Sequence, residues 1–393
     1  MLPCPYSPGA GKPPRWFAGR HEALDLIHAE LQQVAFYGDA AGEDVVFLGA
    51  RGLGKTSLLS VISARAADDG FTVGSGMCGP GRSVIDALAV SLVEAASAAG
   101  VGGDRRSWRD RLQTIRVELS AVGPKVGAEW DMADTETAAA QLSQPGFLQL
   151  VTTAAQLCRE NNRPGVVLLV DELQEGSGPE LNALMTTTQQ LAAQRTPVTL
   201  VGAGLPNSTE VITRAASSSE RVRFEHIDRL TRPNSLEALL RPAEQAGVTW
   251  SREAADRVID SSQGYPYFLQ LFGKRTWMNA QPEAGDVIAP ASAEDGVRAA
   301  EQTAAEGVFA QRYGQATPTE QKFLQAMAKL AGPSSDPVRM ADIGSELEIG
   351  RPAGLSPQRA SLISKGIIAP AGHGFVQFTV PGFAAYVLHS SGA

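Results

Sequence analysis

The chain has 393 residues, enough for about two or three domains of ordinary size. Hydrophobic residues make up 43% and charged residues 19%, so the composition predicts a folded protein with a substantial core and excludes a disordered chain. A net charge of −8 excludes a protein that coats nucleic acid by bulk charge, and it leaves open a local DNA-reading element.

The sequence contains no pattern typical of secretion or of a membrane span. The longest apolar run, residues 165–170, is far shorter than the roughly 20 residues that cross a bilayer. Residues 1–15 contain five prolines and no apolar stretch, so we expect a flexible lead-in instead of a signal peptide. Three cysteines without a CxxC pair argue against a disulfide scaffold or a zinc site. We therefore expect a cytoplasmic protein without membrane contact.

Short apolar runs alternate with helical patterns between Trp16 and about Leu230. Continuous apolar strands separated by helices predict a parallel sheet that is covered on both faces. The expected strands are Val45–Leu48, Phe71–Val73, Val166–Val170, Val198–Val201 and Val222–Phe224. The spacing of apolar residues after the first of these runs predicts a helix directly behind it.

Composition divides the chain into blocks. We expect a flexible segment 1–15, an α/β core 16–230 with a hairpin insertion near 115–132, a helical lid 231–280, a linker and connecting helix 281–311, and a last domain 312–393. In the lid, Ser235 and Ser251 are candidate helix N-caps. The insertion has two open interpretations, a hairpin packed on the domain surface or a contact for a partner or nucleic acid.

A phosphate-binding loop is the strongest motif in the sequence. Residues 49–56 fit the pattern G-x-x-x-x-G-K-[ST] between an expected strand and an expected helix. Glycines let backbone N–H groups surround phosphates, Lys55 neutralises the β- and γ-phosphates, and Thr56 offers a hydroxyl to Mg²⁺. The expected nucleotide-binding residues here are Gly49, Ala50, Arg51, Gly52, Leu53, Gly54, Lys55, Thr56 and Ser57.

Two carboxylates follow the third expected strand. Asp171 stands at the strand tip, where it is predicted to hold Mg²⁺, and Glu172 comes next, where it is predicted to accept a proton from the attacking water. Burying two acids at a strand end without a cation would be costly. The alternative is an acidic helix N-terminus, which also favours Asp and Glu.

These two motifs resemble the AAA+/STAND group of P-loop ATPases, in particular prokaryotic ATPases similar to archaeal origin-recognition proteins, over about residues 14–390. Residues 17–22 resemble the GR-x-E box, which places Arg20 near the adenine. Residues 201–207 resemble the sensor-1 strand and its exit loop. Residues 264–269 resemble the lid motif, in which Pro266 would pack on the base. The resemblance implies an α/β P-loop NTPase fold with a helical lid, and Mg²⁺ with ATP or ADP as ligands.

Two further catalytic candidates each have a plainer alternative. Asn207 is the first polar side chain after the sensor-1 strand, so it is either a water-orienting residue or a turn residue behind Pro206. Arg221 stands before the fifth expected strand, where an arginine of this group can reach the γ-phosphate of a neighbouring subunit. That role would require self-association on ATP binding. The alternative is an exposed Glu–Arg pair worth about 0–1 kcal/mol.

The last block has the pattern of a winged helix. Helices are expected over 319–330, 340–347 and 356–365, the third with Ser356 as its N-cap, and strands on both sides of residues 372–374 would form the wing. From Arg312 onward the block carries seven basic and five acidic residues, a charge of +2. If it binds DNA, the candidate contacts are Arg351, Arg359, Lys365 and His373.

The sequence therefore predicts an ATPase with slow turnover, and two functions remain open. In the first, ATP binding and hydrolysis drive a regulatory or signalling switch that contacts partners through its winged helix. Pro266, standing where many relatives carry a lid arginine, favours this function. In the second, the chain is a nucleotide-dependent DNA-binding protein related to replication initiators, with residues 312–393 as the DNA contact.

Overall fold

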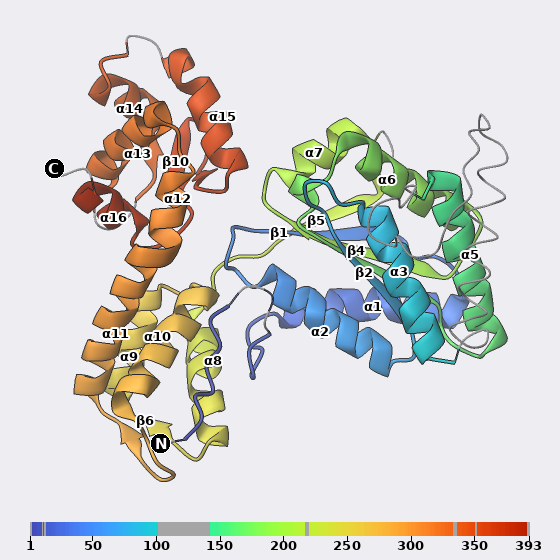
Figure 1. The fold of residues 1–393 in the computed structure, drawn as a ribbon, viewed down its shortest axis with the longest axis horizontal. Helices are drawn as coiled ribbons and strands as arrows, with labels where there is room; N and C mark the ends of the chain where they lie inside the picture. The colour runs from blue at the N-terminus through green and yellow to red at the C-terminus, as the bar shows by residue number, and fades with distance from the viewer. Residues whose placement is uncertain are drawn as a thin grey trace, which may run out of the picture. The chain divides into compact units, whose positions relative to one another are not determined.

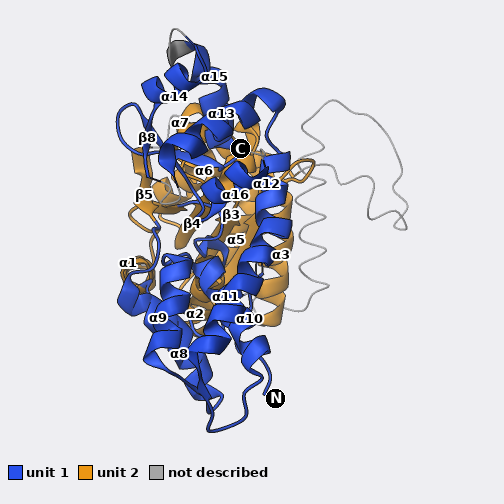
Figure 2. Ribbon diagram, turned by 90° about the vertical axis from the view of Figure 1, so that its left-hand side faces the viewer, with its two compact units in different colours: residues 1–20, 49–57, 227–393 blue, residues 21–48, 58–226 orange. Residues whose placement is uncertain are grey.

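The computed structural model describes residues 2–9, 11, 13–100, 142–216, 220–332, 336–349 and 352–390. The expected hairpin near 115–132 and the DNA-contact candidate Arg351 lie outside these residues. The chain forms two compact units, shown in different colours in Figure 2. Unit 1 comprises residues 1–20, 49–57 and 227–393, and unit 2 comprises residues 21–48 and 58–226.

Unit 2 is built on a parallel sheet. Its strands are β1 (Asp44–Leu48), β2 (Thr72–Met77), β3 (Val166–Asp171), β4 (Val198–Gly204) and β5 (Val222–His226). Among the described residues they pair in the order β2-β3-β4-β1-β5, all parallel. The five strands predicted from apolar runs are therefore confirmed, and β4 is the extra strand between β1 and β3.

The register of the sheet aligns the ends of three strands. Gly202 of β4 pairs with Val46 of β1 on one side and with Val170 of β3 on the other. Because all three strands run in the same direction, their carboxyl ends lie at one edge of the sheet. That edge is where the phosphate-binding loop leaves β1 and where the carboxylates follow β3.

Helices cover both faces of this sheet, as Figure 1 shows. One face packs against α3 (Val84–Ala98), α5 (Gln144–Glu160), α6 (Gly178–Ala193) and α7 (Ser208–Ala215). The other is covered by α1 (His21–Tyr37) and α2 (Lys55–Asp68). Alternate residues of the strands point to opposite faces, so continuous apolar runs are needed to fill both cores. The β3 strand is buried over its whole length for this reason.

The helical lid belongs to unit 1. Within its expected range, 231–280, it contains α8 (Arg232–Gln245), α9 (Arg252–Ser262) and α10 (Pro266–Ala280). The helix α11 (Pro290–Ala304) follows in the segment expected as a linker and connecting helix, and β6 (Thr249–Trp250) forms a short parallel pair with β7 (Val287–Ile288). Ser251 caps α9 by accepting a hydrogen bond from the N–H of Ala254. Ser235 is not a cap. It lies inside α8, whose cap is Thr231, because Pro233 in the first turn starts the helix earlier.

The N-terminal segment differs from the mobile lead-in expected from its proline content. Tyr6 is only 3% exposed and its ring makes edge contacts with Trp250 and Trp277 of the lid. Its hydroxyl donates to the carbonyl of Leu239 at 2.6 Å and accepts from the indole N–H of Trp250 at 3.0 Å. Tyr6 thus fixes this segment on the lid, because its ring is buried and its hydroxyl both donates and accepts a hydrogen bond.

The C-terminal part of unit 1 begins with a π-helical turn, residues 305–309, and α12 (Ala310–Gly314). The helices α13 (Pro318–Ala331), α14 (Met340–Glu346), α15 (Ser356–Ser364) and α16 (Phe383–Ser390) surround a small sheet. Its strands β8 (Val338–Arg339), β9 (Ile368–Pro370) and β10 (Phe375–Phe378) pair in the order β8-β10-β9.

The start of α15 corrects one prediction. Ser356 is the first helical residue and not its cap, since a short 3₁₀ turn over residues 352–355 leads directly into the helix. The antiparallel hairpin of β9 and β10 encloses residues 372–374, where the wing is expected. Within the described ranges, no helix combines the length and apolar character needed to cross a bilayer.

A buried carboxylate anchors this C-terminal part. Glu320 is 4% exposed, and its Oε2 atom accepts from the N–H of Thr317 at 2.7 Å and from the ammonium of Lys365 at 2.6 Å. Thr317 accepts in return from the N–H of Glu320, which completes a capping box at the start of α13. Burial alone would raise the pKa of Glu320, but hydrogen bonds from Lys365, Ser361 and Thr317 outweigh it and lower the pKa to about 2.

We predict that Glu320→Gln lowers the free energy of unfolding by about 3 kcal/mol at pH 7, because it leaves the Lys365 ammonium without its partner. A carboxyl whose pKa is lowered on folding stabilises the protein above its unfolded pKa, and that contribution fades as the pH falls toward about 2. Urea unfolding at pH 7 and pH 3 should therefore show a smaller difference between wild type and variant at pH 3.

Glu346→Gln is the matched control, since Glu346 pairs with Lys329 at 3.4 Å with both side chains more than a third exposed. Such an exposed pair contributes about 0–1 kcal/mol, so this variant should unfold almost like the wild type. Equal effects of the two substitutions at pH 7 would show that the Glu320–Lys365 pair has no special role.

Candidate functional site

The phosphate-binding loop connects β1 to α2, as its motif predicts. Lys55 is the first residue of α2 and is 7% exposed. Its ammonium donates to the carbonyl of Gly49 at 2.8 Å and to that of Ala50 at 3.1 Å. The positive charge of the loop therefore lies over the first two peptide units of the motif.

The next three carbonyls of the loop are also held by donors, all from within unit 1. The Tyr265 hydroxyl donates to the carbonyl of Arg51. The Tyr267 N–H donates to the carbonyl of Gly52 at 3.3 Å, and Arg20 donates to the carbonyl of Leu53 at 3.1 Å. Each carbonyl oxygen from Gly49 to Leu53 thus has a donor, and the set combines the lysine, the lid and the segment before α1.

Gly52 is required at the centre of this arrangement. Its φ of 90° is a conformation that side chains rarely adopt. A Cβ atom at this position would lie 2.7 Å from Cε1 of Tyr265, too close for any side chain. The absence of a side chain at Gly52 therefore lets the lid tyrosine lie directly against the loop.

These contacts fix which way the peptide units face. In a planar trans peptide the C=O and N–H groups point in opposite directions, so holding the carbonyls turns the N–H groups toward the other side of the loop. The N–H of Leu53 is the exception, since it donates to the carbonyl of Ala50 at 3.4 Å. A row of N–H groups next to a helix N-terminus is suited to an anion such as phosphate. The loop therefore has the chemistry of a phosphate site, to which Gly54, Thr56 and Ser57 also belong by sequence.

Arg20 contacts backbone carbonyls of the structure, whereas the family resemblance places it near the adenine. Besides Leu53, it donates to the carbonyl of Asp228 at 2.7 Å. Burial lowers the pKa of Arg20 from its ordinary value, and the Asp228 carboxylate opposes that shift. The guanidinium thus holds backbone carbonyls, and its contact with an adenine stays a prediction.

The acidic pair lies at the carboxyl end of β3 in unit 2. Asp171 is 6% exposed, and its Oδ1 atom accepts from the N–H of Glu172 at 2.8 Å. Glu172 has a φ of 54° and ψ of 41°, a left-handed conformation that costs about 1–2 kcal/mol for a residue with a side chain. Strained backbone of this kind is concentrated at functional sites.

The expected Mg²⁺ ligands fit the metal by their donor chemistry. Mg²⁺ prefers hard oxygen ligands, usually one or two carboxylates together with phosphate oxygens and water. Asp171 offers a carboxylate at the end of a buried strand, and Thr56 offers a hydroxyl at the second residue of α2. The role of both residues as ligands remains a prediction.

The two uncertain candidates lie at opposite edges of unit 2. Asn207 precedes α7, just beyond the carboxyl end of β4, and its Oδ1 atom is buried without a hydrogen-bond partner in the described structure. Arg221 precedes β5, at the amino edge of the sheet, where it donates to the carbonyl of Gly42 at 3.3 Å. Arg221 therefore faces away from the strand ends of its own subunit, and a role at a neighbouring subunit stays a prediction.

Three residues that were not among the predicted site residues bond to them or lie close to one another. Tyr265 flanks Pro266, the first residue of α10, and is 1% exposed. Gln174 follows the acidic pair in a short turn over Leu173–Glu175. Arg312 belongs to α12 and lies close enough to Tyr265 for each group to shift the pKa of the other. Of these three residues, only Tyr265 could have been suspected from the sequence, because its hydroxyl-bearing side chain stands directly before the lid proline, Pro266.

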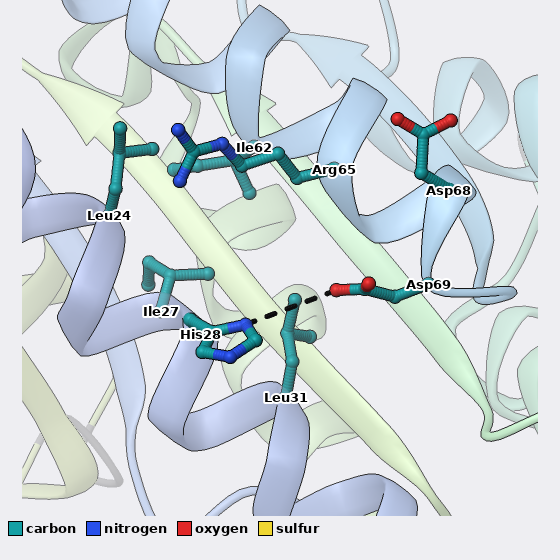
Figure 3. A pocket seen from close by; sticks show the side chains of 8 residues that line it. All are labelled: Leu24, Ile27, His28, Leu31, Ile62, Arg65, Asp68 and Asp69. Carbon is teal, nitrogen blue, oxygen red and sulfur yellow. Dashed lines mark ion pairs between the residues drawn. The ribbon is translucent and has the colours of Figure 1, made fainter.

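A separate pocket of about 290 Å³ lies between α1 and α2 in unit 2 (Figure 3). Its floor is apolar, and charged side chains stand at its rim, with His28 pointing toward Asp69 at 4.0 Å. The lining residues are Leu24, Ile27, His28, Leu31, Ile62, Arg65, Asp68 and Asp69. None of them is a predicted nucleotide contact, so this pocket is distinct from the phosphate-binding loop.

Comparison with protein families supports the site. Residues 17–201 match the AAA ATPase domain, and residues 306–387 match a domain of unknown function (DUF8462). No curated protein sequence matches the chain.

Two solved structures with this fold cover almost the whole chain. A Walker-type ATPase of Pyrococcus abyssi has 12% identity and a TM-score of 0.63, over 94% of this chain and 96% of that one. The ORC2 protein of Aeropyrum pernix, solved as ADPNP–ADP complexes, has 11% identity and a TM-score of 0.61, over 98% and 97% of the two chains. At such identities the likeness shows the fold alone. Residues 17–201 therefore form an AAA ATPase domain with a P-loop, in a chain that is similar in fold to an archaeal origin-recognition protein.

Proposed function

We propose that this ATPase is a STAND-type regulatory switch, in which the nucleotide on the loop controls the C-terminal domain through the lid. The observation that carries this proposal is the hydrogen bond from the Tyr265 hydroxyl to the carbonyl of Arg51. It ties the lid to a peptide unit of the phosphate-binding loop. A phosphate that changes the path of the loop would therefore act directly on Tyr265.

Arg312 extends this link to the C-terminal domain. Its guanidinium lies close enough to Tyr265 for each group to shift the pKa of the other. It also donates to the carbonyl of Gly366 and to the hydroxyl of Thr379, both at 3.2 Å. Burial lowers the pKa of Arg312 from its ordinary value, and Tyr265 opposes that shift. A partly buried arginine has few alternative partners, so movement of Tyr265 would oblige Arg312 to rearrange.

Aromatic side chains provide a second connection alongside the first. The ring of Phe309 lies 5.8 Å from that of Phe268 in α10. It also lies 5.7 Å from the rings of both Phe383 and Tyr386 in α16. Packed aromatic pairs prefer such edge and tilted geometries, and they transmit displacement because a close-packed core cannot deform continuously. The lid and the C-terminal helix are therefore coupled by packing as well as by hydrogen bonds.

The proposed hydrolysis uses the acidic pair as the sequence suggests. The oxygen of a water molecule forms a bond to the γ-phosphorus, the bond from that phosphorus to the oxygen of ADP breaks, and the proton of the water moves to the Glu172 carboxylate and then to solvent. Lys55 and the loop N–H groups would hold the phosphate oxygens. Mg²⁺, held by Asp171 and Thr56, would neutralise phosphate charge when bound.

Pro266 would complete the closed, ADP-bound lid. It begins α10 directly after Tyr265, and its ring has a fixed φ and no N–H, which makes it a rigid apolar wall suited to a nucleotide base. We further propose self-association on ATP binding, with Arg221 as the residue that would reach a neighbouring site. Free cysteines at positions 4, 78 and 158 support a location in the reducing cytosol.

The alternative is a nucleotide-dependent DNA-binding protein with residues 312–393 as a winged helix. The structure removes one of its candidate DNA contacts. Lys365 forms an ion pair with Glu320, so its charge is already neutralised. Arg359 on α15 and the exposed His373 in the hairpin remain, as does Arg351, which lies outside the described residues. The origin-recognition protein shares this fold at 11% identity, which does not by itself assign DNA binding to this chain.

We predict that Glu172→Gln keeps ATP affinity and lowers turnover about 10²–10⁴-fold, because an amide can position water without accepting its proton. Phosphate release and binding of a fluorescent ATP analogue measure the two effects separately. Glu175→Gln, an exposed neighbour in the same turn, is the control and should turn over normally. Lys55→Ala, which removes the ammonium of the loop, gives the reference for lost binding. Wild-type turnover in Glu172→Gln would exclude this residue as the base.

We predict that Tyr265→Phe speeds the release of ADP about tenfold and increases proteolytic cleavage around residues 305–316 in the ADP state. The substitution removes a single hydroxyl, and a hydrogen bond of about 1.4 kcal/mol corresponds to a tenfold change. Stopped-flow release of a fluorescent ADP and limited proteolysis measure the two effects. Tyr313→Phe is the matched control, since the Tyr313 hydroxyl accepts from Gln325 at 2.8 Å and lies on a different hydrogen-bond network. Identical ADP release in both variants and the wild type would contradict the proposed link.

We predict no nucleotide-dependent binding to duplex DNA in fluorescence anisotropy at about 50 mM salt. With Lys365 engaged, about two phosphate contacts remain, which corresponds to a shallow salt slope of about −2 and a weak interaction. The measurement is made with ADP and with a non-hydrolysable ATP analogue. Binding that appears with the ATP analogue and disappears in Arg359→Ala would favour the DNA-binding alternative over the switch.

A further inference from the structure

Gln174 connects the carboxylate after β3 to the end of the neighbouring strand β4. Its side-chain N–H₂ group donates to Oε2 of Glu172. Its side-chain oxygen accepts from the backbone N–H of Leu205 at 2.9 Å. A single amide therefore uses both of its ends to join two strand ends that lie at the same edge of the sheet.

Two glycines of β4 allow the turn of Gln174 to lie this close. A Cβ atom on Gly202 would lie 2.5 Å from Cδ1 of Leu173, the residue before Gln174. A Cβ atom on Gly204 would lie 2.1 Å from the Ser208 hydroxyl and 3.1 Å from the side-chain oxygen of Gln174. The end of β4 is thus shaped so that the amide can reach its backbone.

Unsatisfied polar atoms gather at the same place. The hydroxyl of Ser208, which is fully buried, and Oδ1 of Asn207 have no hydrogen-bond partner in the described part of the chain. A buried polar atom without a partner costs about 1–3 kcal/mol. Their presence immediately after Leu205 indicates that this strand end is built to receive a polar group, such as a water molecule or a phosphate oxygen.

We propose that Gln174 is a positioning residue for ATP hydrolysis: it fixes the Glu172 carboxylate and ties its position to the segment 205–208. The proposal rests on the proposed function of Glu172 as the base. A carboxylate has two oxygens, so a donor on Oε2 leaves the other oxygen able to accept the proton of water. Glu172 lies in left-handed backbone just beyond the end of β3, and the bond from Gln174 restricts its side chain there.

The test compares Gln174→Met with Gln174→Glu in the full chain. The methionine has a similar length and removes both hydrogen bonds. The glutamate keeps the acceptor for Leu205 but cannot donate to Glu172 when ionised. We expect kcat to fall about 10–100-fold in both variants, as for a catalytic group displaced by about 1 Å, with KM for ATP unchanged.

A purely structural role at Leu205 predicts the opposite pattern, in which Gln174→Glu restores kcat. The matched control is Gln156→Met, which removes another bond from a glutamine amide to a glutamate, at 3.2 Å to Glu160 on the exposed side of α5. This control should keep the kcat of the wild type. Recovery of kcat in Gln174→Glu, or a rise of kcat in Gln174→Met, would overturn the positioning role.

A double-variant cycle separates this proposal from the function on which it rests. If Glu172 is the base and Gln174 acts through it, Gln174→Met should cause no further loss of kcat in the Glu172→Gln background. Wild-type turnover in Glu172→Gln alone would contradict the base and the positioning role together. Loss of turnover in Glu172→Gln with wild-type kcat in Gln174→Met would contradict the positioning role alone.

Discussion

The contact on which the site depends is the set of hydrogen bonds to the carbonyl oxygens of residues 49–53. Lys55, Tyr265, Tyr267 and Arg20 provide the donors. Glycine-rich backbone is flexible, and on its own it would lose much conformational entropy when it ordered around a phosphate. Donors that already hold the carbonyls reduce that loss, and they leave most of the loop N–H groups on the opposite side, where a phosphate could bind. The loop is therefore pre-organised by residues that the motif itself does not contain.

In the proposed switch, the same constraint would let the lid respond to nucleotide. Two of the donors, Tyr265 and Tyr267, belong to the start of the lid helix α10, so the loop and the lid share hydrogen bonds. Arg312 and Phe309 continue the connection into the C-terminal domain. A ligand can shift a conformational equilibrium only through contacts that differ between states, and these shared bonds provide such contacts. The domain of residues 306–387 begins within the same connection.

The sequence was sufficient for features that depend on local pattern. Apolar runs predicted the five strands, and the loop and acidic pair lie at the strand ends where their motifs place them. The contacts of Tyr265 and Gln174 could not be predicted in this way. Tyr265 and its acceptor Arg51 are 214 positions apart, and the bond of Gln174 to Leu205 spans 31 positions. Tyr6 shows the same limit, since proline-rich composition indicates mobility whereas its ring packs between two tryptophans of the lid.

The central claim is that the state of the phosphate-binding loop reaches the C-terminal domain through Tyr265 and Arg312. Hydrogen–deuterium exchange of the full chain, with ADP and with a non-hydrolysable ATP analogue, tests this most directly. The account predicts a difference between the two states in peptides that cover residues 49–53, 264–269 and 305–316 together. A difference confined to residues 49–53, with equal exchange at the lid and at residues 305–316, would contradict it.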